Sequence, residues 1–108
     1  MTRDKYLDMM EQLGKEPVEE EIPPDFEDLP DIVNQAVSTF NNLGDRVYPE
    51  IGYIGKDYIN LPFFLDMYDI DDTEFFLEIL SWLDSRAVKQ SSEQLKRQYE
   101  QLKRKSRG

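Results

Sequence analysis

The chain has 108 residues, of which 39% are hydrophobic, and this suits one small domain with a modest core. It carries 23 acidic and 13 basic side chains, a net charge of −10, but neither histidine nor cysteine. A disulfide framework, a thiolate metal site and the usual general base are therefore excluded, and we expect no enzyme, no cofactor and no metal site.

The first predicted element is a helix that Thr2 can cap and that ends at Gly14, where a left-handed stop is expected. Its apolar residues fall on one face: Tyr6, Leu7, Met9, Met10 and Leu13. Charges run through the same segment, MTRDKYLDMMEQLGKE, which is atypical of a signal peptide or a membrane anchor. Because no apolar run in the chain approaches the ~20 residues of a membrane span, we expect a soluble, cytosolic protein.

The next stretch, residues 15–30, reads KEPVEEEIPPDFEDLP and holds four prolines and seven acids. Proline restrains the backbone and the acids repel one another, so we expect an extended connector rather than a strand. Three interpretations stay open: a solvated linker, an acidic recognition strip, or a mimic of the phosphates of nucleic acid.

A second helix is predicted from Pro30, in its first turn, to Gly44. Its apolar residues recur every three or four positions and form one buried stripe: Ile32, Val33, Ala36, Val37, Phe40 and Leu43.

Residues 44–62, GDRVYPEIGYIGKDYINLP, resemble a phosphate-binding loop only superficially. Two residues separate Gly52 from Gly55, where a Walker A loop has four, and Asp57 follows Lys56 where the loop has Ser or Thr. The strand-prone apolar residues favour a packed loop or a small hairpin. Since tyrosines are frequent in interfaces, we predict a partner contact here, formed by Tyr53, Lys56 and Tyr58.

Two more helices follow. A short one begins near a cap at Asn60, with Pro62 in its first turn, and faces the core with Leu61, Phe64, Leu65 and Tyr68. Another begins at Asp72 or Thr73. The acidic run before it, DMYDIDDTE, departs from a calcium loop because Glu74 stands where glycine is needed, so we interpret the acids as helix caps. Trp82 is expected at the margin of the core rather than as a binding anchor.

The last helix carries apolar residues on two sides. When each residue is placed around the helix axis at 100° steps with Phe75 at zero, one group of apolar residues lies between roughly −20° and 140°. A second group, the second stripe, lies between roughly 180° and 240°. Either the helix breaks at the capping box Ser91–Gln94 and folds back, or it continues and its second stripe meets another chain or another part of the protein. We predict that this stripe binds a partner through Val88, Leu95, Tyr99 and Leu102.

The predicted architecture is thus mainly α: a small helical bundle with a proline-rich acidic connector, a Gly/Tyr loop or small hairpin, and a long C-terminal helix. We divide it into an acidic helical body, residues 1–90, and a basic C-terminal helix or tail, residues 91–108. The expected core consists of Val33, Val37, Phe40, Leu65, Phe76, Ile79, Leu80 and Leu83.

The charges are divided along the chain. Residues 1–85 carry a net −16 and residues 86–108 a net +6. The basic end is consistent with solubility and with the preference of cations for a helix C-terminus. It is also consistent with binding to an acidic partner or to nucleic acid, although the acidic body would repel a nucleic acid.

The run MTRDKYLDMMEQLGKEPVEEEIPPDFEDLP, followed by YIGKDY, resembles short acidic proteins of tailed bacteriophages over most of residues 1–70. The resemblance implies an assembly factor, such as a tail-assembly chaperone, or a minor virion component, located in the bacterial cytoplasm or in the virion. We therefore expect a non-enzymatic protein that binds phage or host proteins and that can form homo-oligomers. The alternatives are a nucleic-acid-associated protein using its basic C-terminal helix, and an acidic inhibitor of a host protein.

Overall fold

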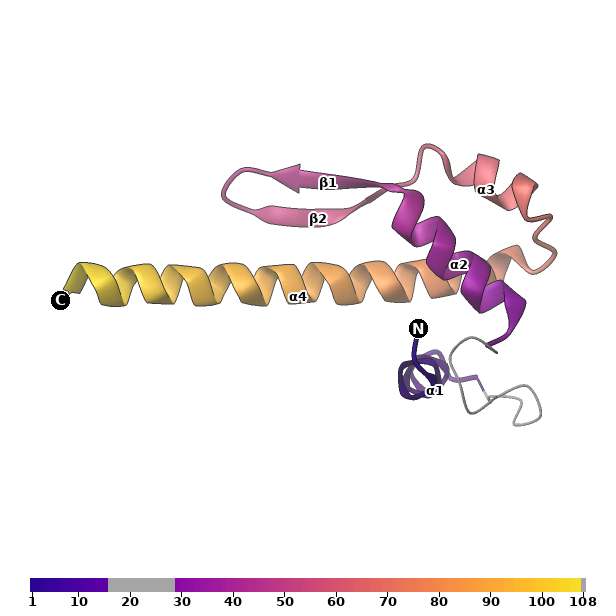
Figure 1. Cartoon of the computed structure of the whole chain (residues 1–108), viewed down its shortest axis with the longest axis horizontal. Helices are drawn as coiled ribbons and strands as arrows, with labels where there is room; N and C mark the ends of the chain where they lie inside the picture. The colour runs from indigo at the N-terminus through magenta and orange to yellow at the C-terminus, as the bar shows by residue number, and fades with distance from the viewer. Residues whose placement is uncertain (16–28, 108) are drawn as a thin grey trace.

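A computed structural model describes residues 1–15 and 29–107. Most of the predicted acidic connector, with its recognition strip, lies outside these residues. The described elements are, in chain order, helices α1 (Arg3–Gln12) and α2 (Asp31–Asn42), strands β1 (Gly44–Tyr48) and β2 (Gly52–Asp57), and helices α3 (Leu61–Met67) and α4 (Thr73–Arg107). The mainly helical architecture predicted from the sequence is confirmed (Figure 1).

Local chemistry sets the ends of the helices. The Thr2 hydroxyl accepts a hydrogen bond from the Lys5 N–H at 3.2 Å, as predicted for the start of α1. Gly14 has φ +68°, and the Lys15 N–H donates to the Met10 carbonyl at 2.8 Å, which closes a Schellman motif. Asp72 caps α4 by accepting from the Phe75 N–H at 3.1 Å. Asp72 therefore acts as a cap, as the sequence predicts.

Two details of the predicted helix ends differ. Helix α2 ends at Asn42, and Gly44 opens β1 instead of stopping the helix. Asn60 occupies the position before α3, but its side chain makes no capping hydrogen bond. The Asp57 carboxylate instead accepts a hydrogen bond from the Ile59 N–H at 3.0 Å. The side-chain hydrogen bond therefore lies in the turn before the helix and not at the predicted cap.

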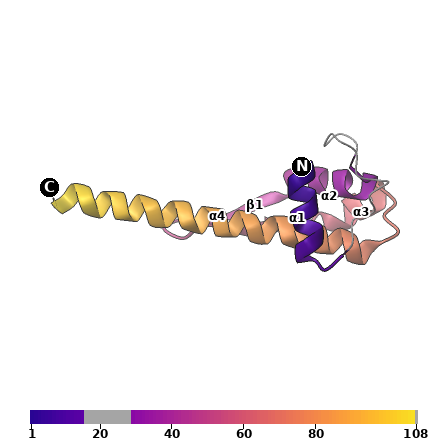
Figure 2. The ribbon, with the colours of Figure 1, turned by 90° about the horizontal axis from the view of Figure 1, so that it is seen from below.

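The core lies where α1 and α2 meet the first half of α4. Helix α1 crosses α4 at a steep angle, and α2 packs against the same part of α4 (Figures 1 and 2). Five of the eight predicted core residues are buried, and Val37, Phe40 and Leu65 pack at its edge. Trp82 is 9% exposed and its indole N–H donates to Gln12 of α1 at 2.6 Å, which confirms a place in the core. The buried apolar residues of the cluster are Tyr6, Met9, Met10, Leu29, Val33, Ala36, Phe76, Ile79, Leu80, Trp82 and Leu83.

Strands β1 and β2 form an antiparallel hairpin that lies along α4 (Figure 1). Arg46 pairs with Gly55 and Val47 with Tyr53, so Ile54 is an extra residue in β2 and forms a bulge. A small hairpin was one of the two forms predicted for this segment, and the structure shows it.

Helix α4 runs without a break through the predicted capping box at Ser91. Its 35 residues span roughly 52 Å at 1.5 Å per residue. The radius of gyration is 17.0 Å, whereas a compact chain of this length has about 13 Å. The molecule is therefore elongated, because the C-terminal part of α4 extends past the tip of the hairpin (Figure 1).

Candidate functional surface on the hairpin and the last helix

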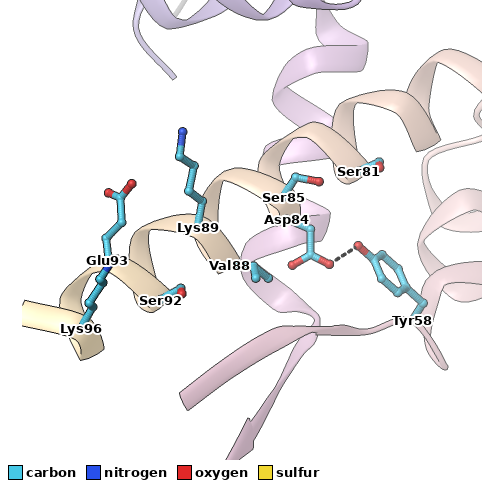
Figure 3. Close-up of a pocket in the computed structure, with 9 residues that line it drawn as sticks. All are labelled: Tyr58, Ser81, Asp84, Ser85, Val88, Lys89, Ser92, Glu93 and Lys96. Atoms are coloured by element: carbon cyan, nitrogen blue, oxygen red, sulfur yellow. Dashed lines mark hydrogen bonds between the residues drawn. The ribbon is translucent and has the colours of Figure 1, made fainter. Parts of the chain in front are cut away.

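One carboxylate on α4 holds the hairpin in place. Oδ1 of Asp84 accepts from the Tyr53 hydroxyl at 2.6 Å. Its Oδ2 accepts from the Tyr58 hydroxyl, also at 2.6 Å (Figure 3). The backbone N–H of Lys56 lies 3.2 Å from both oxygens. Two turns further along the helix, the Ser91 hydroxyl accepts from the Tyr53 N–H at 3.3 Å. The hairpin is thus attached to α4 at two points.

The bulge explains why both tyrosines reach the same carboxylate. In a regular strand, side chains five positions apart point to opposite faces, as Tyr53 and Tyr58 would. The extra residue Ile54 shifts the alternation by one. Gly55 follows with φ +132°, and a Cβ there would lie 3.3 Å from Oδ2 of Asp84. Glycine at position 55 therefore permits both the bend and the close approach of the helix.

Burial and hydrogen bonds shift the pKa values of Asp84, Tyr53 and Tyr58 in this cluster. Partial burial raises the pKa of Asp84, but the bonds from Tyr53, Tyr58 and the Lys56 N–H outweigh it, so its pKa lies below the usual value. Burial and then the bond to Asp84 raise the pKa of each tyrosine well above its ordinary value of about 10. With its oxygens engaged and its basicity lowered, Asp84 is poorly suited to accept a proton from a substrate. We interpret the cluster as structural.

Raising the pH above about 10 is expected to release the hairpin. Both tyrosines ionise at higher pH in the folded chain than in the unfolded chain, so their stabilising effect is complete below about pH 10 and is lost as the pH rises toward the folded pKa values. Ultraviolet absorbance of phenolate should show a late component in the wild type that is missing in the double variant Tyr53→Phe, Tyr58→Phe. Curves of the same shape would contradict the cluster.

Lys56 lies in the interior and not at the surface. Its side chain is about 10% exposed, and its ammonium bonds to the Asp45 carboxylate at 2.6 Å and to the Leu43 carbonyl at 3.3 Å. The same ammonium stands 4.6 Å from the centre of the Phe40 ring. The sequence placed Lys56 among the partner-binding residues, whereas in the structure its charge joins the hairpin to the end of α2.

A shallow groove runs beside the hairpin along α4 (Figure 3). Tyr58 and Ser81 lie at one end, and Lys96 lies at the other. Its remaining lining residues all come from α4: Asp84, Ser85, Val88, Lys89, Ser92 and Glu93. None of these hydroxyls is paired with histidine, since the chain has none, so the groove lacks the usual base that activates a serine.

The structure divides the predicted partner-binding stripe into two parts. At 100° per residue, Asp84, Ser91, Val88 and Leu95 all lie within about 60° of one another, so the hairpin covers the side of α4 from which the stripe begins. Val88 and Leu95 are half-buried, while Tyr99 is 49% and Leu102 is 62% exposed. The N-terminal part of the stripe, Val88 and Leu95, is therefore partly covered within the same chain. Only its C-terminal part, Tyr99 and Leu102, is open to a partner.

Of the predicted hairpin contacts, Tyr58 is 38% exposed and Tyr53 is half-buried. The most exposed apolar residues of the hairpin lie instead at its tip: Val47, Tyr48 and Ile51. Sequence reasoning missed Asp84 and Ser91, although both stand on the same side of the helix as Val88. Asp84 is an acidic residue on the same side of the helix as apolar residues. This position is the signal that could have identified it as a residue that contacts another segment of the chain.

Comparison with protein-family models, with curated proteins and with solved structures finds no match for this chain. In the part of the chain that the structure describes, every helix is too short or too polar to cross a membrane. Among residues 1–15 and 29–107, no three acidic side chains are placed to hold a metal ion together.

Proposed function

We propose that the protein is a non-enzymatic assembly or accessory protein that binds other proteins through the projecting end of α4, residues 95–107. The observation that carries this proposal is the pair of large side chains, Tyr99 and Leu102, which are exposed on the part of α4 that extends beyond the core. A solvated helix end has no need of apolar residues, whereas a helix that docks into a groove presents them at such spacings.

Leu95, Tyr99 and Leu102 form what we call the tail stripe. They occupy an arc of about 60° on α4 and extend over about 10 Å of its length. Lys96 and Lys103 lie next to this arc in the helical projection. An apolar strip beside lysines suits a partner surface that is apolar in the middle and acidic around it.

The resemblance to acidic phage proteins supports the same class of function. Such a protein would act in the cytoplasm of a bacterial host during assembly, or as a component of the virion. The hairpin enters this proposal only through Tyr58, which is 38% exposed, because Tyr53 is half-buried and Lys56 is buried. The alternative of an acidic inhibitor depends on Glu19, Glu20 and Glu21, which lie outside the described residues.

A photo-crosslinking amino acid in place of Tyr99 is expected to form adducts with protein in a bacterial extract. The matched control is the same amino acid in place of Tyr48, which is 55% exposed on the hairpin tip compared with 49% for Tyr99. Adducts from position 99 should resist nuclease and should disappear when Leu102→Asp is added. Equal adducts from both positions, or none from position 99, would contradict the proposal.

Nucleic acid is the second candidate, and one observation favours it. The segment from Lys96 to Arg107 spans roughly 16 Å of helix, beyond a Debye length of about 8 Å at physiological salt, so the acidic body repels a polymer there only weakly. Binding through phosphates would fall steeply with salt and would disappear when residues 94–108 are deleted. In the crosslinking experiment it would yield adducts that nuclease removes.

A further inference from the structure

Helix α3 exposes an apolar face. Its inward residues Leu61 and Leu65 pack against the core. Three apolar residues nearby are exposed: Ile59, in the turn just before the helix, is 78% exposed, and Phe63 and Met67, on the opposite side of the helix from Leu61 and Leu65, are 64% and 53% exposed. We call these three residues the α3 face. A short helix with apolar residues on both sides is atypical of a surface helix, which normally has a polar outer side.

The α3 face lies in an acidic stretch of the sequence. Residues 57–85 contain eight acids and neither lysine nor arginine. Five of the acids lie within or just after α3 in the sequence, are exposed, and form no ion pair within the part of the chain that the structure describes: Asp66, Asp69, Asp71, Asp72 and Glu74. The occupant that fits this surface is therefore a helix with apolar residues on one side and cations beside them.

The tail stripe has that chemistry. Residues 94–107 hold six basic side chains against Glu100 alone. Two tails placed side by side would bring like charges together, which opposes a symmetric pairing of tails. The acids around α3 and the cations around the tail stripe instead complement each other, and so do their apolar residues.

We propose that the tail stripe of one copy docks on the α3 face of a second copy. The two surfaces lie at opposite ends of the molecule, with α3 at one end and the C-terminus of α4 at the other (Figures 1 and 2). A copy bound by its tail therefore keeps an unoccupied α3 face. Contacts of this head-to-tail kind extend into open chains, or into rings where the rotation closes. This inference rests on the proposed function, because it names a partner for the tail.

The test uses two full-length variants that each lack one surface. The tail variant carries Tyr99→Ser and Leu102→Ser, and the α3 variant carries Phe63→Ser and Met67→Ser. Light scattering should show that the mass of the wild type rises with concentration past that of a dimer at ~0.1 M salt and falls at ~1 M salt, where the Debye length shrinks from about 10 to about 3 Å. Each variant alone should remain at the 12.8 kDa of one chain.

Mixing the two variants in equal amounts gives the sharpest readout. One intact tail then meets one intact α3 face, so the mass should reach two chains and no further. A variant with Val47→Ser and Ile51→Ser, which alters apolar residues of similar exposure on the hairpin tip, should assemble like the wild type. Unchanged fluorescence of Trp82 confirms that each variant is folded.

Three outcomes would overturn this inference: a wild type that stays monomeric, an α3 variant that associates as well as the wild type, or a mixture that stays monomeric. A tail that pairs symmetrically would give the second outcome, and a foreign acidic partner would give the first. Failure here is distinguishable from failure of the proposed function, because a monomeric protein that still forms protein adducts from position 99 retains that function with another partner.

Discussion

Replacing Phe76 by alanine is expected to lower the free energy of unfolding by about 3–5 kcal/mol. The side chain is fully buried and is the largest such residue in the core shared by α1, α2 and α4. Its removal leaves a cavity that these helices can fill only in part. Since small domains are stable by about 5–15 kcal/mol, the variant should be close to unfolding at 25 °C. Urea unfolding, followed by the fluorescence of the single tryptophan, Trp82, measures the loss.

Phe63 supplies a matched control for this prediction. It is the same residue type but is 64% exposed on α3, where it makes an edge contact with Phe64 at 5.4 Å between ring centres. Phe63→Ala should therefore cost less than about 1 kcal/mol. Similar losses in the two variants would mean that the core is not centred on α4.

The second large effect is expected at Asp84. Asp84→Ala removes the acceptor for two hydroxyls and one backbone N–H, and hydrogen bonds to a charged group contribute about 1.5–3 kcal/mol. Because these bonds hold the hairpin and not the core, the loss should appear as local opening. Amide hydrogen exchange in β1 and β2 should quicken roughly 10- to 150-fold, while the fluorescence of Trp82 stays unchanged.

Two further comparisons isolate the cause. Glu93→Ala removes an exposed acid from the same helix, so it controls for charge and for helix propensity and should leave exchange in the hairpin unchanged. Gly55→Ala should open the hairpin as Asp84→Ala does, because a Cβ there is strained at φ +132° and crowds the carboxylate, whereas Gly44→Ala meets open space. If exchange stays slow in Asp84→Ala, the hairpin is held by other contacts.

The helices could be predicted because their signals are local. Thr2, Gly14 and Asp72 act within a few residues of their own position, and the spacing of apolar residues in α2 and α4 marks the sides that meet in the core. The single long helix was less certain, since the pattern at Ser91 also fits a cap. In the structure the Ser91 hydroxyl does not cap a helix, because it accepts a hydrogen bond from the Tyr53 N–H of the hairpin.

The position of the hairpin depends on contacts that no local pattern contains. Tyr53 and Asp84 are 31 residues apart, and their bond requires the bulge at Ile54. Lys56 and Asp45 are both charged residues in a turn-rich segment, so the sequence suggests exposure for each. Only the tertiary structure buries the ammonium beside Phe40. The exposure of Tyr99 and Leu102 agrees with a helix periodicity that the chain's own core does not use, and this periodicity is visible in the sequence. That these residues bind a partner stays a prediction.

Helix α4 contains neither glycine nor proline from Thr73 to Arg107, so it has no residue that commonly kinks a helix. The direction in which the tail stripe faces is therefore set by counting residues from the core. Adding or removing one residue would turn the stripe by about 100° and move it by about 1.5 Å, whereas seven residues would return it nearly to its first direction. The number of residues in α4 thus fixes the direction in which the tail stripe faces relative to the core, and in the head-to-tail contact proposed above it would also set how the second copy is rotated about the helix axis.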